Sequence, residues 1–486
     1  MALLTKSKYM TGLQCPKCLW VTFNDPKRLP PFDASRQFIF DQGHAVGEIA
    51  KKLFSNGVDV PTEDFKLNLQ QTKALLTERR PIFEAGFLSG ELYARVDVLR
   101  PSGNNGWEII EVKSSTNVKD EHIQDVAFQK HVCEKAGLKI TGCSLMRIDN
   151  QYVRQGDMNP AKFLAQEDVS GLVDVEIARV PDKVAAMFKI IREPKEPDVP
   201  IGPQCNQPYE CPLKELCWAF LPSRSVFELY RGGQKAFDLL GQGTVTMADI
   251  PETFPFTHIQ RIQKEAVVKN SAHIDKPALQ NFFAQLKWPL YFMDFETISP
   301  AVPIFDGTRP YQKIPFQFSL HVISKGLESP QHYSFLAEGP QDPRPAFLKE
   351  LKRLIGDSGT VIVYNQTFEE NVLEQLAVSF PDEAVWIRHV IDRMVDLLVP
   401  FRSFHYYHPD QKGSASIKVV LPILTGKGYE GMAISEGEGA SQEFYRVTYH
   451  DVPAEERAQV RQRLEEYCQL DTQAMIDIML KLKSHI

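Results

Sequence analysis

The stretch Tyr291–Thr297 holds two carboxylates, Asp294 and Glu296, separated by one residue. The apolar residues around them predict a buried strand, in which alternate side chains point to the same side. Two carboxylates on one side repel each other unless a positive charge lies between them, and a divalent cation is the usual solution. The stretch therefore predicts a metal-binding position on a strand.

Two further acidic positions lie later in the chain. Glu369 follows a short apolar run, where a predicted strand ends and a predicted helix begins, a usual place for active-site groups in α/β sheets. Asp471 lies on a predicted helix one turn after Tyr467, so the hydroxyl and the carboxylate share one face. Carboxylates from separate elements, with a tyrosine to orient water, suit a two-metal phosphoryl-transfer site whose ions lie about 3.5–4 Å apart.

A second acidic group lies in the first half of the chain. Asp97 lies on one strand of a predicted hairpin, and Glu111 and Lys113 share one face of the other. An Asp and a Glu that hold one divalent ion, with a Lys beside the attacking water, suit phosphodiester hydrolysis. The ion lowers the pKa of the water and neutralises charge on the phosphate. Gln124 follows this group in the chain, on the helix predicted from about residue 120.

Five of the eight cysteines lie at the two ends of the first half: Cys15 and Cys18 near the start, and Cys205, Cys211 and Cys217 in a proline-rich stretch. One early thiol and three late ones would close a four-cysteine site. Zinc and a [4Fe–4S] cluster both accept four thiolates. The other three cysteines lie in apolar surroundings, which is typical of inert buried thiols.

Composition sets the frame for these sites. A chain of 486 residues predicts two or three domains, and 43% hydrophobic with 24% charged residues is typical of a soluble globular protein. The net charge of −7 does not indicate nucleic-acid binding, although metal-binding carboxylates lower it. No run of about eighteen apolar residues and no signal peptide are present, so we expect no membrane span. We expect a cytoplasmic protein with reduced or metal-bound cysteines.

The predicted elements divide the chain into three regions: 1–220, 221–286 and 287–486. The first holds the hairpin and the cysteines. The second has two short predicted helices broken at a glycine pair, which indicates a helical linker and faintly resembles a helix-hairpin-helix. The third begins with strands and continues with α/β alternation, which predicts a mixed sheet. Its predicted strands are 287–297, 310–323, 331–336 and 360–364, and its predicted helices include 347–355 and 368–380.

The N-terminal residues resemble the PD-(D/E)XK nuclease superfamily, and within it the RecB-type group. Asp97 matches the family's Asp, Glu111-Val-Lys113 matches (D/E)-X-K, and Gln124-x3-Phe128 matches Q-x3-Y with Phe for Tyr. The resemblance implies a restriction-endonuclease-like core with one Mg²⁺ or Mn²⁺ on Asp97 and Glu111. It also implies that Lys113 and Gln124 assist catalysis.

This sequence departs from the family in its first helix. The family's G-x-x-x-H places a metal-binding His four residues after a Gly, but here Gly47 follows Gly43 at that spacing. His44 and Glu48 lie one helical turn apart on the same face and are the candidate substitutes. A histidine with no ligand role is the equal alternative.

The cysteine layout is similar to that of the CRISPR-associated RecB-type nucleases and the AddB nuclease. In those proteins one Cys before the nuclease core and three after it hold a [4Fe–4S] cluster. The resemblance implies the same cluster here, with zinc as the alternative occupant. Cys18 is an alternative to Cys15 as the first ligand. The implied ligands are Cys15, Cys205, Cys211 and Cys217.

The C-terminal residues resemble the DEDD exonucleases of the RNase H-like fold, in the DnaQ-like branch. Asp294-Phe-Glu296 matches D-x-E, Tyr467-x3-Asp471 matches Y-x3-D, and the segment ending at Glu369 matches N-x2-F-D with Glu for Asp. The resemblance implies two Mg²⁺ or Mn²⁺ ions held by the four acidic residues. Tyr467 would place the attacking water.

Two more residues resemble positions of that group. Asp396 resembles an Asp with a supporting role near the site, and Lys418 lies in a segment similar to the group's S-L-K. Lys418 would face a phosphate. The alternative for this segment is a helix N-cap formed by Ser414 or Ser416.

As a whole, the chain resembles a bacterial family of unknown function that fuses a RecB-like iron–sulfur nuclease to an RNase H-like exonuclease. We therefore expect a metal-dependent nuclease with two active sites. DNA is favoured over RNA as its partner, in repair, recombination or defence. The alternatives are a nucleic-acid-binding scaffold in which one site has decayed, and an exonuclease that acts on RNA.

Overall fold

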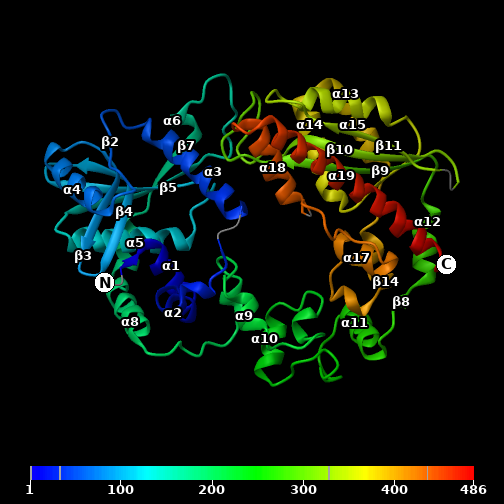
Figure 1. Cartoon of the computed structure of the whole chain (residues 1–486), viewed down its shortest axis with the longest axis horizontal. Helices are drawn as coiled ribbons and strands as arrows, with labels where there is room; N and C mark the ends of the chain where they lie inside the picture. Colours follow the sequence, from blue (N-terminus) through cyan, green and yellow to red (C-terminus); the bar gives the residue numbers. More distant parts are fainter. Residues whose placement is uncertain (1–2, 32–33, 327–328, 435) are drawn as a thin grey trace. The chain divides into compact units, whose positions relative to one another are not determined.

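The computed structural model describes residues 3–31, 34–326, 329–434 and 436–486. Contacts divide the chain into two compact units. The first is Met1–Phe220 with Pro300–Tyr311, and the second is Leu221–Ser299 with Gln312–Ile486. Each unit contains a mixed sheet with helices packed against it (Figure 1), so the predicted α/β class is confirmed. No helix in the described ranges is both long enough and apolar enough to cross a membrane.

The first unit is built on a seven-stranded sheet of order β2-β3-β4-β5-β6-β7, with β1 paired to β4. Strands β3, β4 and β5 form an antiparallel meander, and β5 pairs with β6 in parallel. The strands are β1 (Leu4–Thr5), β2 (Val58–Asp59), β3 (Ile82–Ser89), β4 (Leu92–Ser102), β5 (Gly106–Lys113), β6 (Ile140–Ile148) and β7 (Leu164–Asp168).

Helix α5 (Asp120–Lys135) connects β5 to the parallel strand β6 and lies in the core of this unit, because Val126, Ala127 and Phe128 are completely buried. Helix α1 begins directly after β1, where the Thr5 hydroxyl accepts a hydrogen bond from the Lys8 N–H and caps the helix. The other helices are α1 (Lys6–Gln14), α2 (Pro16–Asn24), α3 (Ala34–Lys51), α4 (Phe65–Leu75), α6 (Pro160–Phe163), α7 (Ser170–Ile177), α8 (Val180–Arg192) and α9 (Lys214–Trp218).

The second unit is built on a five-stranded sheet of order β11-β10-β9-β12-β13. Strand β10 is antiparallel to both β9 and β11, whereas β12 runs parallel to β9 and β13. The strands are β9 (Leu290–Ile298), β10 (Ile314–Ile323), β11 (Gln331–Leu336), β12 (Thr360–Val363) and β13 (Met394–Asp396).

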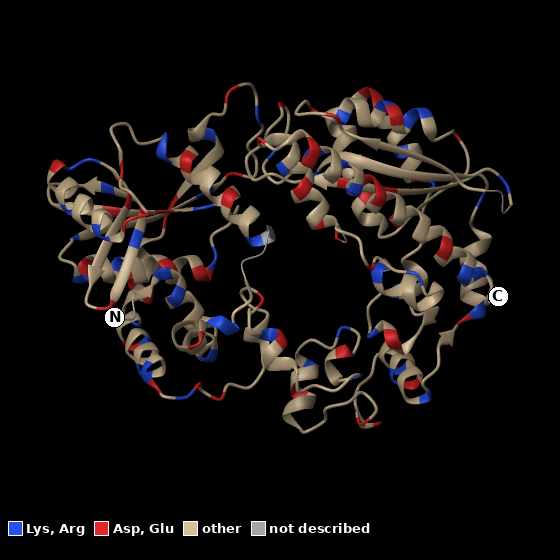
Figure 2. Cartoon of the chain, in the orientation of Figure 1, with Lys and Arg blue, Asp and Glu red and all other residues tan. Residues whose placement is uncertain are grey.

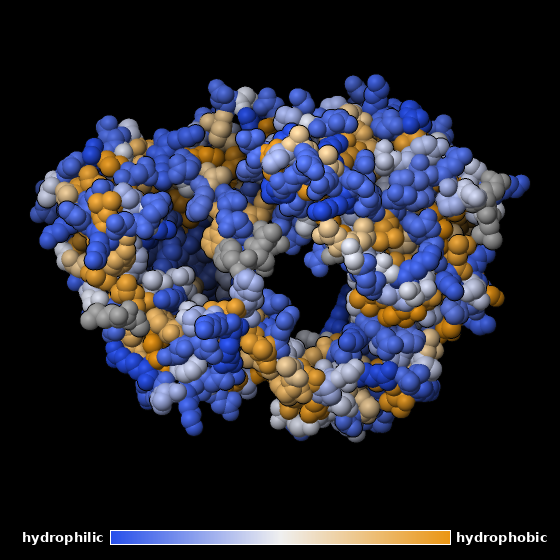
Figure 3. Space-filling view, viewed as in Figure 1, coloured by the Kyte–Doolittle hydropathy of each residue, from blue (hydrophilic) through white to orange (hydrophobic). Residues whose placement is uncertain are grey.

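Helices cover both faces of this sheet. On one face, Met293 and Phe295 join a core cluster with Phe347 of α13 (Arg344–Leu354) and Val372 of α14 (Gln366–Ser379). Helix α19 (Ala454–Lys483) lies across β9 and β10 on the face that carries Asp294. Exposed side chains are mostly hydrophilic in the view of Figure 3, with hydrophobic ones scattered among them. The remaining helices are α15 (Ala384–Ile391), α16 (Val399–Arg402), α17 (Ile417–Thr425) and α18 (Gly437–Tyr449).

Residues 221–286, predicted as a separate linker, fall within the second unit. They form α10 (Gln234–Gly241), α11 (His258–Lys269) and α12 (Lys276–Ala284). A short strand, β8 (His273–Ile274), pairs with β14 (Tyr406–Tyr407). Apolar packing of α11 on Phe404 and Tyr407 explains why this region is joined to the second unit.

Residues 300–311, predicted as part of the C-terminal domain, fall within the first unit. The Ala301 N–H donates a hydrogen bond of 2.8 Å to the Gln42 side chain. Arg154 exchanges backbone hydrogen bonds with this segment at 2.9 and 3.0 Å. The segment leaves β9 directly after its acidic residues and returns to β10. We call it the inserted segment.

Candidate metal centres

Three carboxylates meet on one face of the second sheet. Asp294 and Glu296 project from β9, and Asp471 projects from α19, which lies across that strand. One oxygen of each lies within 4.8 Å of one oxygen of the others. Strand alternation explains the first two, because the intervening and flanking residues Met293 and Phe295 point to the apolar core on the other face.

Glu369 adds a fourth carboxylate from the first turn of α14. Its side chain is buried, and its Oε2 has no hydrogen-bond partner among the described residues. Burial and the charge of Asp294 raise the pKa of Glu369 well above its usual range. A buried carboxylate oxygen without a partner is unfavourable in isolation, and a cation would satisfy it.

Asp396 supports the junction that carries Glu369. Its Oδ1 accepts hydrogen bonds of 2.9 Å from the backbone N–H groups of Asn365 and Leu398. Asn365 precedes α14 with a left-handed φ of 80°, a conformation that asparagine tolerates better than most residues. Asp396 therefore fixes the start of the helix.

Two tyrosines stand beside Asp471. The Tyr429 hydroxyl donates a hydrogen bond of 2.5 Å to Asp471 Oδ1, and the hydroxyl of Tyr467 also lowers the pKa of this carboxyl through a hydrogen bond. Burial nevertheless raises the pKa of Asp471 to about 6. The spacing of one helical turn predicts Tyr467 at this place, whereas Tyr429 lies in a loop and belongs to no motif.

Lys418 supplies positive charge at this site. Its Nζ lies 5.8 Å from the ring centroid of Tyr429 and 5.4 Å from that of Tyr467, and its charge opposes the rise in the pKa of Asp294. Ser416 is the N-cap of α17 but makes no side-chain cap hydrogen bond. Lys418 thus lies beside the carboxylates.

The buried negative charge exceeds what these neighbours neutralise. Burial, followed by the charge of neighbouring carboxylates, raises the pKa of both Asp294 and Glu296 well above the usual range. Among the described residues, the ammonium group of Lys418 opposes these shifts, and that of Lys313 opposes the shift in the pKa of Glu369, but neither cancels them. The donor set consists of carboxylate oxygens, which are the ligands that Mg²⁺ and Mn²⁺ prefer.

A polar cluster ties α19 to the sheet behind the carboxylates. Thr472, the neighbour of Asp471, contacts the Ser319 hydroxyl at 2.7 Å and His321 Nδ1 at 2.8 Å. Burial lowers the pKa of His321 to about 4, so its ring is neutral near pH 7. Gln317, on the same face of β10, donates a hydrogen bond of 2.9 Å to the Leu464 carbonyl. These contacts fix the position of Asp471 over β9.

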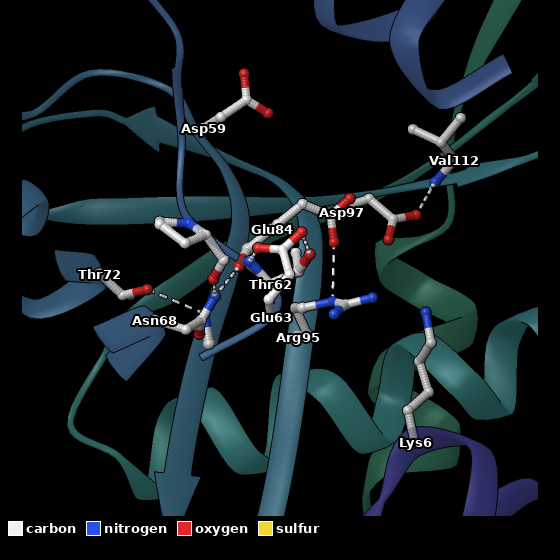
Figure 4. A network of polar contacts seen from close by, with 12 residues as sticks. Lys6, Asp59, Thr62, Glu63, Asn68, Thr72, Glu84, Arg95, Asp97 and Val112 are labelled. Atoms are coloured by element: carbon white, nitrogen blue, oxygen red, sulfur yellow. Dashed lines mark hydrogen bonds and ion pairs between the residues drawn. The ribbon is translucent and has the colours of Figure 1, made fainter. Parts of the chain in front are cut away.

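A second polar cluster lies in the first unit. Asp97 Oδ2 accepts a hydrogen bond of 2.8 Å from the Val112 N–H (Figure 4). Glu111 is buried, and its Oε1 accepts a hydrogen bond of 2.6 Å from Lys113 Nζ. Burial and the charge of Glu111 raise the pKa of Asp97 to about 7. Burial alone would raise the pKa of Glu111, but the ammonium groups of Lys113 and Lys6 hold it below its usual range.

Three residues that the motifs did not include complete this cluster. Lys6 Nζ lies 2.7 Å from Glu111 Oε1. Gln129 Nε2 donates hydrogen bonds to Glu111 Oε2 at 2.7 Å and to Asp125 Oδ1 at 2.9 Å. Asp125 and Gln129 lie one helical turn apart on the same face of α5.

Gln124 lies outside these contacts. It is half-buried, and in the described ranges no hydrogen bond joins it to Glu111 or Lys113. The next residue, Asp125, lies on the face of α5 that is turned toward Glu111 and Lys113 of β5. Phe128 of the same motif is buried, and its ring stacks on Tyr9 at a centroid distance of 4.5 Å.

His44 and Glu48 are both exposed on α3. Glu48 Oε1 lies 2.6 Å from Lys51 Nζ. Within the described part of the chain, neither side chain makes a hydrogen bond or an ion pair with Asp97 or Glu111. The structure therefore does not bring these candidate substitutes onto the acidic pair.

The five clustered cysteines come from both ends of the first unit. Cys18 packs in one apolar cluster with Cys15 and Cys211, and a hydrogen bond from its thiol lowers the pKa of Cys211 to about 6. Among the described residues, no three of these sulfurs lie within 4.8 Å of one another. Four of them line one small pocket: Cys15, Cys205, Cys211 and Cys217.

The sequence matches a family within the second half of the chain. Residues 291–416 match the model of the family "Domain of unknown function (DUF2779)". The DUF2779 match includes Asp294, Glu296, Glu369 and Asp396, and it ends before Tyr429 and Asp471. Three of the four carboxylates thus lie in the matched stretch, and the fourth reaches them on α19.

Three curated proteins are similar to this chain. "Uncharacterized protein MG366 homolog" from Mycoplasma pneumoniae is 26% identical over 267 residues, which is 51% of this chain and 40% of that protein. "Uncharacterized protein MG366" from Mycoplasma genitalium is 24% identical over 226 residues, 43% of this chain and 34% of that protein. "Uncharacterized protein UU173" from Ureaplasma parvum is 25% identical over 235 residues, 43% and 33% respectively. The matched stretch thus covers 40% or less of each relative.

Proposed function

We propose that the chain is a metal-dependent nuclease with two active sites that hydrolyse phosphodiester bonds, with DNA favoured as the substrate. The observation that carries the proposal is the group of Asp294, Glu296 and Asp471, whose oxygens lie within 4.8 Å of one another. Glu369 stands beside them with an oxygen that has no partner among the described residues. This donor set fits divalent cations.

The strand orders support the finer fold assignments. The order β11-β10-β9-β12-β13, with β10 antiparallel to its neighbours, suits an RNase H-like domain. The meander β3-β4-β5, continued by α5 and the parallel strand β6, suits a PD-(D/E)XK core. Asp97 and the Glu111–Lys113 pair lie on the adjacent strands β4 and β5, in the middle of the sheet, which is where such a core needs them.

The C-terminal site has a role for each of its side chains. Asp294, Glu296, Glu369 and Asp471 would hold two divalent ions, which when bound neutralise charge on the phosphate and lower the pKa of water. Tyr467 and Tyr429 orient Asp471, and Tyr467 also positions the attacking water. Lys418 binds a phosphate oxygen of the substrate. In Figure 2, Lys and Arg are interspersed with Asp and Glu on the helices of this unit. We therefore expect individual cations, such as Lys418, to bind the phosphates of the nucleic-acid strand.

In the N-terminal site, Asp97 and Glu111 would hold one Mg²⁺ or Mn²⁺, and Lys113 orients the water or stabilises charge on the phosphate. Gln129 and Asp125 hold Glu111 and Lys113 in position through hydrogen bonds of 2.7 Å each. This site has two ammonium groups for three carboxylates, so its demand for a cation is smaller than that of the C-terminal site.

The cysteine pocket fits a [4Fe–4S] cluster with a structural role. Zinc, which also accepts four thiolates, is the alternative occupant. The pocket lined by Cys15, with Cys18 outside it, favours Cys15 as the first ligand.

We expect protein purified without oxygen to be brown and to contain about four irons per chain. Replacing Cys15 with serine should remove most of this iron and the visible absorption, because the cluster loses a ligand. Replacing Cys18 with serine should leave both largely unchanged. Iron analysis and absorption spectra of the two variants test this, and the reverse ranking would make Cys18 the ligand. Stoichiometric zinc in place of iron would contradict the cluster.

The nuclease proposal is tested by replacing one carboxylate in each site. With Mn²⁺, wild-type protein should cleave labelled strands, and Asp97→Asn and Asp294→Asn should each remove the activity of one site. Single- and double-stranded DNA and single-stranded RNA are assayed in parallel, so that a preference for RNA would be seen directly. If the wild type cleaves nothing, or neither change matters, the proposal is wrong.

A scaffold with one decayed site is the second candidate. It is favoured by the exposure of His44 and Glu48. This chain lacks the family's metal-binding histidine, and neither of these residues takes its place beside Asp97. In that case Asp294→Asn would remove all cleavage, Asp97→Asn would remove none, and the first unit would still bind nucleic acid.

A further inference from the structure

We propose that the ammonium group of Lys6 binds the Glu111 carboxylate in the metal-free protein and competes with a divalent ion for that carboxylate. The inference rests on the proposed metal-binding function of the N-terminal site. It concerns a residue outside the motifs of that site.

The Glu111 carboxylate already accepts hydrogen bonds from three side chains. Its Oε1 accepts Lys113 at 2.6 Å and Lys6 at 2.7 Å, and its Oε2 accepts Gln129 at 2.7 Å. The Glu111 side chain is only 1% exposed. A carboxylate offers about four lone pairs, two on each oxygen. The two ammonium groups already use both of those on Oε1, so an ion that binds through this oxygen displaces one of them.

Lys6 is the donor that leaves most easily. Lys113 lies on β5 within the sheet and has a second short contact, 2.7 Å to Asp125 Oδ2. Lys6 lies 3.7 Å from the same oxygen, so its ammonium has one short contact in this cluster where that of Lys113 has two, and its side chain is 29% exposed. Gln129 is completely buried on α5. Figure 4 shows Lys6 extending from α1 towards the strands that carry Asp97 and Val112.

The charges agree with an exchange of cations. Asp97, Glu111 and Asp125 carry three negative charges when ionised, against two positive charges on Lys6 and Lys113. A divalent ion added to this set would leave an excess positive charge in a buried site. Departure of the Lys6 ammonium restores neutrality, and its charge then lies at the rim, where a phosphate of the substrate can receive it.

The test measures Mn²⁺ binding by the full-length chain, from the loss of the free-ion electron paramagnetic resonance signal. All proteins carry Asp294→Asn, which weakens binding at the other site. Lys6→Met and Lys6→Gln remove the competing charge, and Lys8→Met is the matched control. Lys8 lies on the same helix, but its ammonium contacts the Leu3 carbonyl and the Phe23 ring.

Both Lys6 variants should bind Mn²⁺ about 10-fold more tightly than the parent, the gain expected if Lys6 occupies Glu111 in about nine of ten metal-free molecules. Lys8→Met should match the parent. Unchanged or weaker binding by a folded Lys6 variant overturns the inference, and circular dichroism establishes which variants are folded. If Asp97→Asn leaves this binding unchanged, the proposed metal site itself is wrong and the inference fails with it.

Discussion

Glu369→Gln should reduce hydrolysis by the C-terminal site by more than about 100-fold, since changes to residues that merely support metal ligands already reduce activity by about 10–100-fold. Glutamine keeps the size of the side chain but removes the charge that would bind an ion. Mn²⁺ affinity at this site should fall in parallel. Activity on a labelled single strand and Mn²⁺ binding are measured in an Asp97→Asn background, so that only one site contributes.

Glu370→Gln provides the matched control. Glu370 is the next residue on α14, but it lines a groove together with α15 residues such as Ile387 and Arg388. This variant should keep wild-type activity. Equal losses in the two variants would mean that the damage lies in α14 rather than in a metal ligand, and full activity of Glu369→Gln would exclude it from the site.

The second large effect concerns stability without metal. Burial raises the pKa of Asp471 from 3.8 to about 6, so the folded protein binds this proton more tightly than the unfolded chain. The stability from this group is therefore fully present below about pH 4 and is lost as pH rises through about 6. A pKa difference of one between the folded and unfolded states corresponds to about 1.4 kcal/mol. At pH 8 the ionised Asp471 therefore lowers the free energy of unfolding by about 3 kcal/mol.

Asp471→Asn should therefore raise the melting temperature by several degrees at pH 8 in a chelator, and by much less at pH 4. In an Asp97→Asn background, where only the C-terminal site remains, saturating Mn²⁺ should raise the melting temperature of the protein with Asp471 and have little effect on the protein with Asp471→Asn. Glu465→Gln, at an exposed position on the same helix, is the control and should change neither. A variant that is less stable than the wild type at pH 8 in chelator would show that ionised Asp471 does not lower the free energy of unfolding of the metal-free protein.

Local patterns predict much of the C-terminal site. Alternation along β9 places Asp294 and Glu296 on one face, and the helical repeat places Tyr467 beside Asp471, so these pairs follow from neighbouring residues alone. The strands predicted at 310–323 and 331–336 appear as Ile314–Ile323 and Gln331–Leu336. Approach of α19 to β9 depends on buried contacts such as Ser319 with Thr472, which no short pattern contains.

The residues that local patterns miss lie far from their partners in the chain. Lys6 and Glu111 are 105 positions apart, and Tyr429 and Asp471 are 42 apart. The motif points to Gln124, yet Gln129 makes the contact with Glu111 because of the rotation of α5 in the core. Asp125 is one position after Gln124, and a shift of one position turns a side chain to another face of the helix. Asp125 and Gln129 share the face that contacts Glu111 and Lys113, and only packing decides which face that is.

The inserted segment, residues 300–311, has a consequence for how such a protein can arise or be divided. The chain passes between the two units three times, after Phe220, after Ser299 and after Tyr311. A single cut in the gene therefore cannot separate the two units cleanly. A cut after Phe220 leaves the inserted segment with the second unit, and a cut after Tyr311 leaves residues 221–299 with the first. In the first case, Ala301 would lose the apolar neighbours that bury it. The two units are thus expected to be inherited together, as one piece of sequence.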